Sequence, residues 1–132
     1  MLSVYTFASK NSDVEWAMSG LDGDSYVVNT SHLKGGVEDI MNSNSFKEKE
    51  ETFHIHSHPG IYGTKGPSGN DEYKVDRYGP PMNRFIYHPA TNSWYKYSSP
   101  IVPKGFEYFN GRHQSIKVKS PTIYNLKNPY YR

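Results

Sequence analysis

The sequence predicts a single domain of the mixed α/β (α+β) class, and three observations support this. Its 132 residues are enough for one hydrophobic core. Short segments with strand-like alternation flank a stretch whose apolar residues follow helical spacing. Leu, Ile, Val and Phe together number only 25, whereas Tyr alone contributes 12. Because aromatic side chains bury large areas, we expect an aromatic, strand-rich core rather than a bundle of Leu-rich helices.

Strand and helix signals alternate along the chain. An Asp-Gly pair at 22–23, typical of hairpin turns, separates the first two strand-like segments. Apolar residues at helical spacing then predict an amphipathic helix, and the alternating segment after it predicts a strand that stops at Pro59. The expected elements are a short segment at 2–9 that suits either helix or strand, strands at 14–18, 25–29, 52–58, 84–87, 93–97 and 115–119, helices at 37–51 and 70–78, and an irregular remainder.

Composition excludes several classes of site. The chain has no cysteine, so a metal would have to be bound by His and carboxylate side chains. No apolar run approaches the roughly 18 residues of a membrane helix, and residues 1–10 lack the pattern of a secretory signal. Residues 1–66 hold 5 basic and 9 acidic side chains, and residues 67–132 hold 10 and 4. The basic charges are dispersed among Pro, Asn and Tyr, which favours a solvated surface over a nucleic-acid site.

One segment carries most of the chemistry. His54, His56 and His58 alternate within the sequence FHIHSHP. Side chains two residues apart on a strand share a face, so these imidazoles can point in the same direction. Paired imidazoles are natural zinc ligands, but a catalytic zinc needs a third ligand and an open position for water. We expect that ligand to be a carboxylate.

Two further segments offer the missing groups. Ser68 and Asp71 follow a Gly-rich loop and provide a hydroxyl and a carboxylate three residues apart at an expected helix start. Glu15 is an acid within an otherwise apolar strand segment, and it is a plausible general base for a zinc-activated water. Taken alone, Glu15 would be interpreted as an exposed strand carboxylate; the histidine segment changes that interpretation.

Together these residues resemble the JAMM (MPN/JAB) zinc metallopeptidases, whose pattern is a glutamate on an early strand, then HSHP, then SxxD. More narrowly, the chain is similar to the JAB-like toxin domains at the C-termini of bacterial polymorphic toxins, including Rhs-type proteins. This resemblance covers residues 3–97. It rests on NSDVEW at 11–16, TSH at 30–32, HIHSHPG at 54–60 and GPSGND at 66–71.

The resemblance implies zinc on His56, His58 and Asp71, with Glu15 activating the water and Ser68 stabilising the oxyanion. It implies a curved mixed sheet with flanking helices, of the cytidine-deaminase-like kind. A core at 1–97 would carry an extension at 98–132 within the same domain. Nine residues separate His58 from Ser68, roughly two more than is usual in the family, an insertion that a loop can absorb at low entropic cost. His54 is expected to support the site or the fold rather than bind the metal.

The expected function is zinc-dependent hydrolysis of peptide or isopeptide amides by a toxin or effector domain of a larger secreted bacterial protein. The enzyme would act in the target-cell cytoplasm on a protein or peptide, with ubiquitin-linked proteins among the candidates, as for a deubiquitinase. A cognate immunity protein is the expected partner, and neither membrane nor nucleic acid is expected. The alternatives are a catalytically inactive MPN-like binding module and, less favoured, a metal-dependent nuclease toxin.

Overall fold

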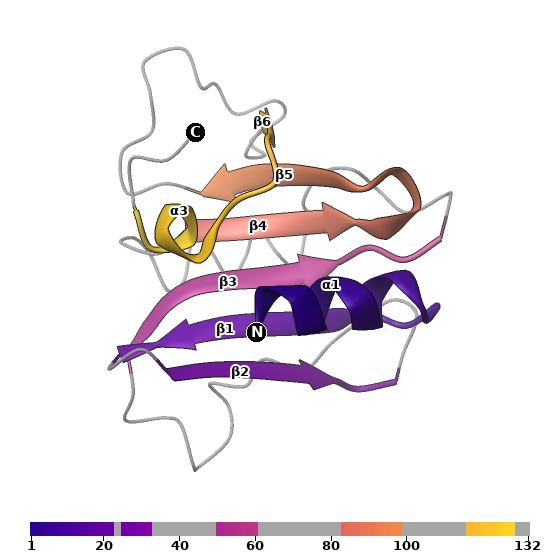
Figure 1. Ribbon diagram of the computed structural model, residues 1–132, viewed down its shortest axis with the longest axis horizontal. Coiled ribbons are helices and arrows are strands. Elements are labelled where there is room, and N and C mark those ends of the chain that lie inside the picture. Colours follow the sequence, from indigo (N-terminus) through magenta and orange to yellow (C-terminus); the bar gives the residue numbers. More distant parts are fainter. Residues whose placement is uncertain (23–24, 33–49, 61–82, 99–115, 129–132) are drawn as a thin grey trace, which may run out of the picture.

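The framework is a six-stranded mixed sheet with the strand order β2-β1-β3-β4-β5-β6 (Figure 1). The computed structural model describes residues 1–22, 25–32, 50–60, 83–98 and 116–128. Neighbouring strands are antiparallel except β3 and β4, which run parallel. The strands are β1 (Trp16–Leu21), β2 (Ser25–Thr30), β3 (Glu51–Ser57), β4 (Asn83–His88), β5 (Ser93–Ser98) and β6 (Ile116–Val118).

Two helices cover one face of this sheet (Figure 1). Helix α1 (Leu2–Lys10) contributes Tyr5 to the core, and the short helix α3 (Ile123–Lys127) contributes Leu126. The core is aromatic as expected, with the Tyr87 and Trp94 rings 4.6 Å apart. No helix in the described part of the chain is long and apolar enough to cross a membrane. The fully buried core side chains are Tyr5, Met18, Phe53, Ile55, Phe85, Tyr87, Trp94 and Leu126.

The mixed α/β prediction is confirmed. Strands β2 to β6 begin and end within about one residue of their expected bounds, whereas β1 begins two residues and ends three residues later than expected. The ambiguous N-terminal segment is the helix α1. The C-terminal segment expected to be irregular instead forms α3, whose start is fixed by a capping box between Thr122 and Asn125. Glu51 was expected to end a helix, but it begins β3. Glu50 belongs to no helix either. Residues 37–49 of that expected helix and the helix at 70–78 lie outside the described residues.

The second face of the sheet is polar. Phe53 and Ile55 of β3 point into the core, so the alternating His54 and His56 point to the other side. Neighbouring strands place Ser19 opposite His54 and Arg84 beside it. These polar side chains are nevertheless buried. We call this surface the histidine face; its members are Ser19, His54, His56, Arg84 and Tyr97.

Close packing at Gly20 generates the first testable prediction. A Cβ at Gly20 would overlap the Phe53 ring and come within 2.7 Å of Thr52 Oγ1. Gly20→Ala should therefore cost about 3 kcal/mol through overpacking, or roughly 10 °C in Tm. Thermal denaturation followed by circular dichroism measures this. Gly60→Ala is the matched control because its Cβ would meet nothing within 4 Å, leaving only about 1 kcal/mol for its positive φ. Equal losses in the two variants would contradict the packing argument.

Candidate metal centre

His56 and His58 converge at the C-terminal end of β3. Their Nε2 atoms lie 3.1 Å apart, and the two side chains belong to residues that are only 3% and 6% exposed. The His58 backbone N–H donates to the Tyr87 carbonyl at 3.0 Å, which extends the pairing with β4 past the last β3 residue. Two nitrogens bound tetrahedrally to one zinc at 2.0–2.1 Å would be about 3.3 Å apart. The histidine pair therefore fits a zinc ion with little movement.

The antiparallel register between β1 and β3, continued past the ends of the two strands, brings the backbone of Glu15 toward this pair. Ala17 is the Cα partner of His56, so continuing the register by two residues sets Glu15 opposite His58, on the face that carries both imidazoles. Glu15 is half-buried. Its carbonyl oxygen accepts a 2.6 Å hydrogen bond from Thr30 Oγ1 on β2. The backbone that carries the expected general base is thus held in place from the neighbouring strand.

Ser57, between the two histidines, connects the site to the core. Its Oγ accepts a 2.9 Å hydrogen bond from the Trp16 backbone N–H, directly after Glu15. Ser57 also lies beside the buried Tyr5 of α1. Burial raises the pKa of the Tyr5 phenol well above its usual value, and the Ser9 and Ser57 hydroxyls act in the opposite direction. Helix α1 therefore supports the segment that presents both histidines.

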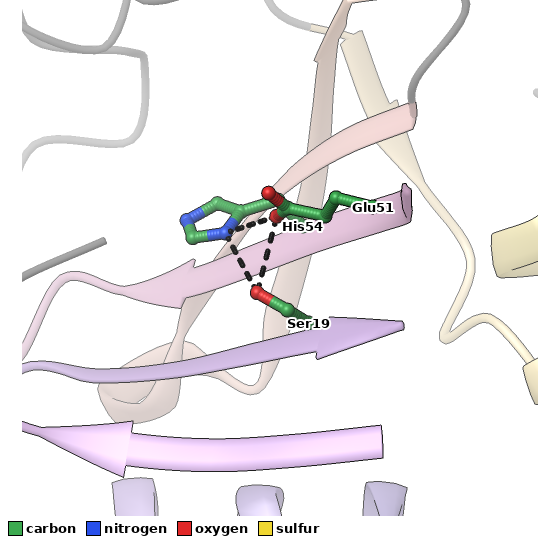
Figure 2. A network of polar contacts seen from close by, with 3 residues as sticks. All are labelled: Ser19, Glu51 and His54. Carbon is green, nitrogen blue, oxygen red and sulfur yellow. Dashed lines mark hydrogen bonds and ion pairs between the residues drawn. The ribbon is translucent and has the colours of Figure 1, made fainter. Parts of the chain in front are cut away.

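His54 is held by two polar side chains on its own face (Figure 2). Its Nδ1 lies 3.0 Å from Glu51 Oε1 and 3.3 Å from Ser19 Oγ, and the serine hydroxyl donates to the same carboxylate at 3.1 Å. Because an ionised carboxylate only accepts, we assign the proton to Nδ1. Both contacts of the imidazole are made by the same nitrogen, Nδ1. A Ser-His-acid catalytic triad uses opposite ring nitrogens, so this cluster supports structure and is not such a triad.

Ser19 and Glu51 are absent from the sequence-based prediction. Glu51 precedes His54 by three positions, a spacing that would place the two side chains on opposite faces of a regular strand. The register between β1 and β3 shifts at Gly20/Leu21, and such an irregularity can redirect a side chain. Glu51 thereby reaches the histidine face. No pattern in the sequence signals this shift.

The two remaining predicted site residues, Ser68 and Asp71, lie outside the described residues. Within the described ranges no group of three or more His, Cys, Asp or Glu side chains could hold a metal ion. A complete site therefore requires a ligand from elsewhere in the chain. Asp71 as that ligand and Ser68 as the oxyanion donor stay predictions. His32, adjacent to Thr30 and Ser31 in the TSH segment, is exposed and adopts a left-handed backbone conformation with φ 57°.

A comparison with protein families places this geometry in context. The JAB-like toxin 1 family matches residues 1–117 of the chain. The protein belongs to the JAB-like toxin 1 family. A search of curated proteins finds no match. The match includes Glu15, the HSHP segment and the SxxD segment, and it extends past residue 97 into β6. The mixed sheet with few helices is consistent with a JAB-like fold.

For this JAB-like toxin domain, the His54 cluster predicts a measurable stability difference between two adjacent glutamates. Glu51→Ala leaves the buried His54 Nδ1 and Ser19 hydroxyl without their carboxylate and should cost about 1–3 kcal/mol. Glu50→Ala is the control, because Glu50 is exposed and its loss should change stability by less than about 0.5 kcal/mol. Urea denaturation of both variants measures the difference. If Glu51→Ala is as stable as wild type, the cluster contributes nothing to the fold.

Proposed function

We propose that this JAB-like toxin domain is a zinc-dependent hydrolase of peptide or isopeptide amides. The observation that carries the proposal is the 3.1 Å convergence of His56 Nε2 and His58 Nε2. It is supported by the β1–β3 register, which would set Glu15 opposite His58 if it continued two residues past Ala17 and His56. A buried imidazole pair beside a half-buried carboxylate is the arrangement that metal-assisted hydrolysis requires. Membership of a toxin family supports an effector role for that activity.

Zinc is proposed to bind His56, His58 and Asp71. When bound, it supplies a water of lowered pKa and polarises the scissile carbonyl. His56 and His58 would hold the ion from the C-terminal end of β3, a strand that is paired with β1 on one side and β4 on the other. Such rigidity matters because small displacements of catalytic groups reduce rates strongly. Asp71 would complete the ligand set, leaving one position open.

Glu15 is the proposed general base. Its carboxylate would accept a proton from the attacking water and then donate it to the leaving amine. Two hydrogen bonds restrict the backbone around Glu15. Thr30 Oγ1 donates to the Glu15 carbonyl, and the Trp16 N–H donates to Ser57 Oγ. Ser68 would donate a hydrogen bond to the oxyanion that develops on the substrate carbonyl.

The biological setting follows from the toxin family. We propose that the domain is the effector of a larger secreted or contact-delivered bacterial protein, and that it acts in the cytoplasm of the target cell. Substrates would be proteins or peptides, with ubiquitin-linked proteins among the candidates. The producing cell would need a cognate immunity protein to protect itself.

Metal content tests the proposal first. The purified protein, dialysed against zinc and then against buffer, should retain one zinc per chain, measured by inductively coupled plasma mass spectrometry. His56→Ala, His58→Ala and Asp71→Asn should each retain at least tenfold less, because three protein ligands form the site. His88→Ala is the control: His88 lies at the end of β4, where its Nδ1 contacts Thr91 Oγ1. Retention near zero in wild type would favour an inactive binding module.

Catalysis is tested through Glu15. Glu15→Gln keeps the size of the side chain but cannot accept the proton, so turnover should fall about 10²–10⁴-fold with zinc content unchanged. The measurements are cleavage of a diubiquitin panel and of bacterial proteins, and growth arrest on cytosolic expression. The matched control is Glu50→Gln, which should behave as wild type. Equal activity of Glu15→Gln and wild type would exclude Glu15 as the base. DNA cleavage that survives Glu15→Gln and His56→Ala would favour a nuclease.

A further inference from the structure

Arg84 is a buried cation on the histidine face. The residue is 3% exposed and lies on β4 as the Cα partner of His54 in the parallel β3–β4 pair. Its neighbours Phe85 and Asn83 belong to the opposite face, where Phe85 is part of the core. Within the described part of the chain, no hydrogen bond or ion pair engages the Arg84 guanidinium.

This burial is costly for the folded state. A guanidinium stays protonated at all physiological pH values and carries five N–H donors. Removing an uncompensated charge from water costs several kcal/mol, and apolar replacements at buried charges are often neutral or stabilising. The Glu51 carboxylate, which reaches this face, is already bound to His54 and Ser19. None of the described residues therefore occupies the Arg84 donors, and an anion is the chemical group that would match them.

The position of Arg84 relates that anion to the proposed reaction centre. His56 lies one strand spacing across and two residues along from Arg84. With about 4.8 Å between strands and about 6.6 Å for two residues, their Cα atoms are roughly 8 Å apart. Two residues of an extended peptide span about 7 Å. An anionic group bound by Arg84 would therefore lie within about two residues of the bond held at His56 and His58.

We propose that Arg84 is a specificity-determining residue that binds a carboxylate of the substrate, so that the enzyme prefers amides flanked by a negative charge. This inference rests on the proposed amide hydrolysis. Carboxylates are the anions that peptides themselves carry, and the planar guanidinium binds them through two parallel N–H···O bonds. The carboxylate can belong to an Asp or Glu side chain or to a peptide C-terminus.

A stability measurement separates this role from a structural one. Arg84→Met keeps the aliphatic stem and removes the charge, so its Tm should equal or exceed that of wild type. Lys96→Met is the control. Lys96 is 5% exposed and has an interaction partner. It pairs with Phe85, which places it on the face opposite to Arg84. Because its partner would be lost, Lys96→Met should lower the Tm. A Tm for Arg84→Met several degrees below wild type would mean that Arg84 serves the fold.

Substrate preference is the second measurement. The zinc-loaded wild-type protein is incubated with a pool of acetylated hexapeptides of Ala, Leu, Lys, Gln and Glu, made as free acids and as C-terminal amides. Products are sequenced by mass spectrometry. We expect peptides with Glu within two residues of the cleaved bond to be cleaved at least tenfold faster than those with Gln there, or free-acid peptides to be cleaved at least tenfold faster than C-terminal amides. Arg84→Met should reduce that ratio to near one, and Lys96→Met should retain it. The two forms of the pool distinguish side-chain from C-terminal carboxylates.

A binding readout keeps the inference testable if the pool is not cleaved. In a ¹H–¹⁵N NMR spectrum, the Arg84 Nε–H signal is identified by its absence from Arg84→Met. This signal should shift when acetyl-Glu-amide, which has a side-chain carboxylate, or acetyl-Gln, which has a C-terminal carboxylate, is added. It should not shift with acetyl-Gln-amide, which has no carboxylate. A shift without hydrolysis would support the carboxylate site and count against the proposed function. Hydrolysis with unchanged preference in Arg84→Met, or no shift with either carboxylate, would overturn the Arg84 proposal.

Discussion

The hydrogen bond from the Trp16 N–H to Ser57 Oγ joins two segments that are 41 residues apart, and the organisation of the candidate site depends on it. Its donor, Trp16, directly follows Glu15 in the sequence. Its acceptor, Ser57, stands between His56 and His58. Together with the Ala17–His56 register it brings an acid and an imidazole pair to one end of the sheet. Because Ser57 faces the core beside Tyr5, helix packing and site geometry are coupled through one hydroxyl.

The two faces of the sheet divide stability and chemistry between them. One face packs aromatic and aliphatic side chains beneath α1 and α3, and this burial supplies the driving force for folding. The histidine face is equally buried, yet it holds imidazoles, hydroxyls, a carboxylate and a guanidinium. Buried polar groups stabilise a fold only where they are paired. The Ser19–His54–Glu51 cluster meets that condition (Figure 2). Among the residues that the structure describes, none pairs with the Arg84 guanidinium, and departures of this kind are often found at functional sites.

Several features were predictable because they depend on local pattern. The alternation in FHIHSHP predicts a strand with its histidines on one face, and the structure shows β3 with His54 and His56 opposite Phe53 and Ile55. The family resemblance identified Glu15 as a partner of that segment, and the β1–β3 register, continued two residues past Ala17 and His56, is consistent with that role. Glu51 and Arg84 could not be predicted in this way. The position of Glu51 depends on a register shift between β1 and β3. The position of Arg84 depends on the parallel pairing of β3 with β4, which follows β3 only after a long intervening segment.

The amino-acid sequence by itself determined the mixed α/β class, the histidine strand and, through its HSHP and SxxD motifs, the JAB-like toxin family. These properties are set by spacing and residue type, which act over a few positions. Only the tertiary structure decided that Ala17 lies opposite His56, that Glu51 contacts His54, and that Arg84 is buried beside His54. Each of these juxtapositions depends on strand order and register, which arise from burial of the whole core and from no single segment.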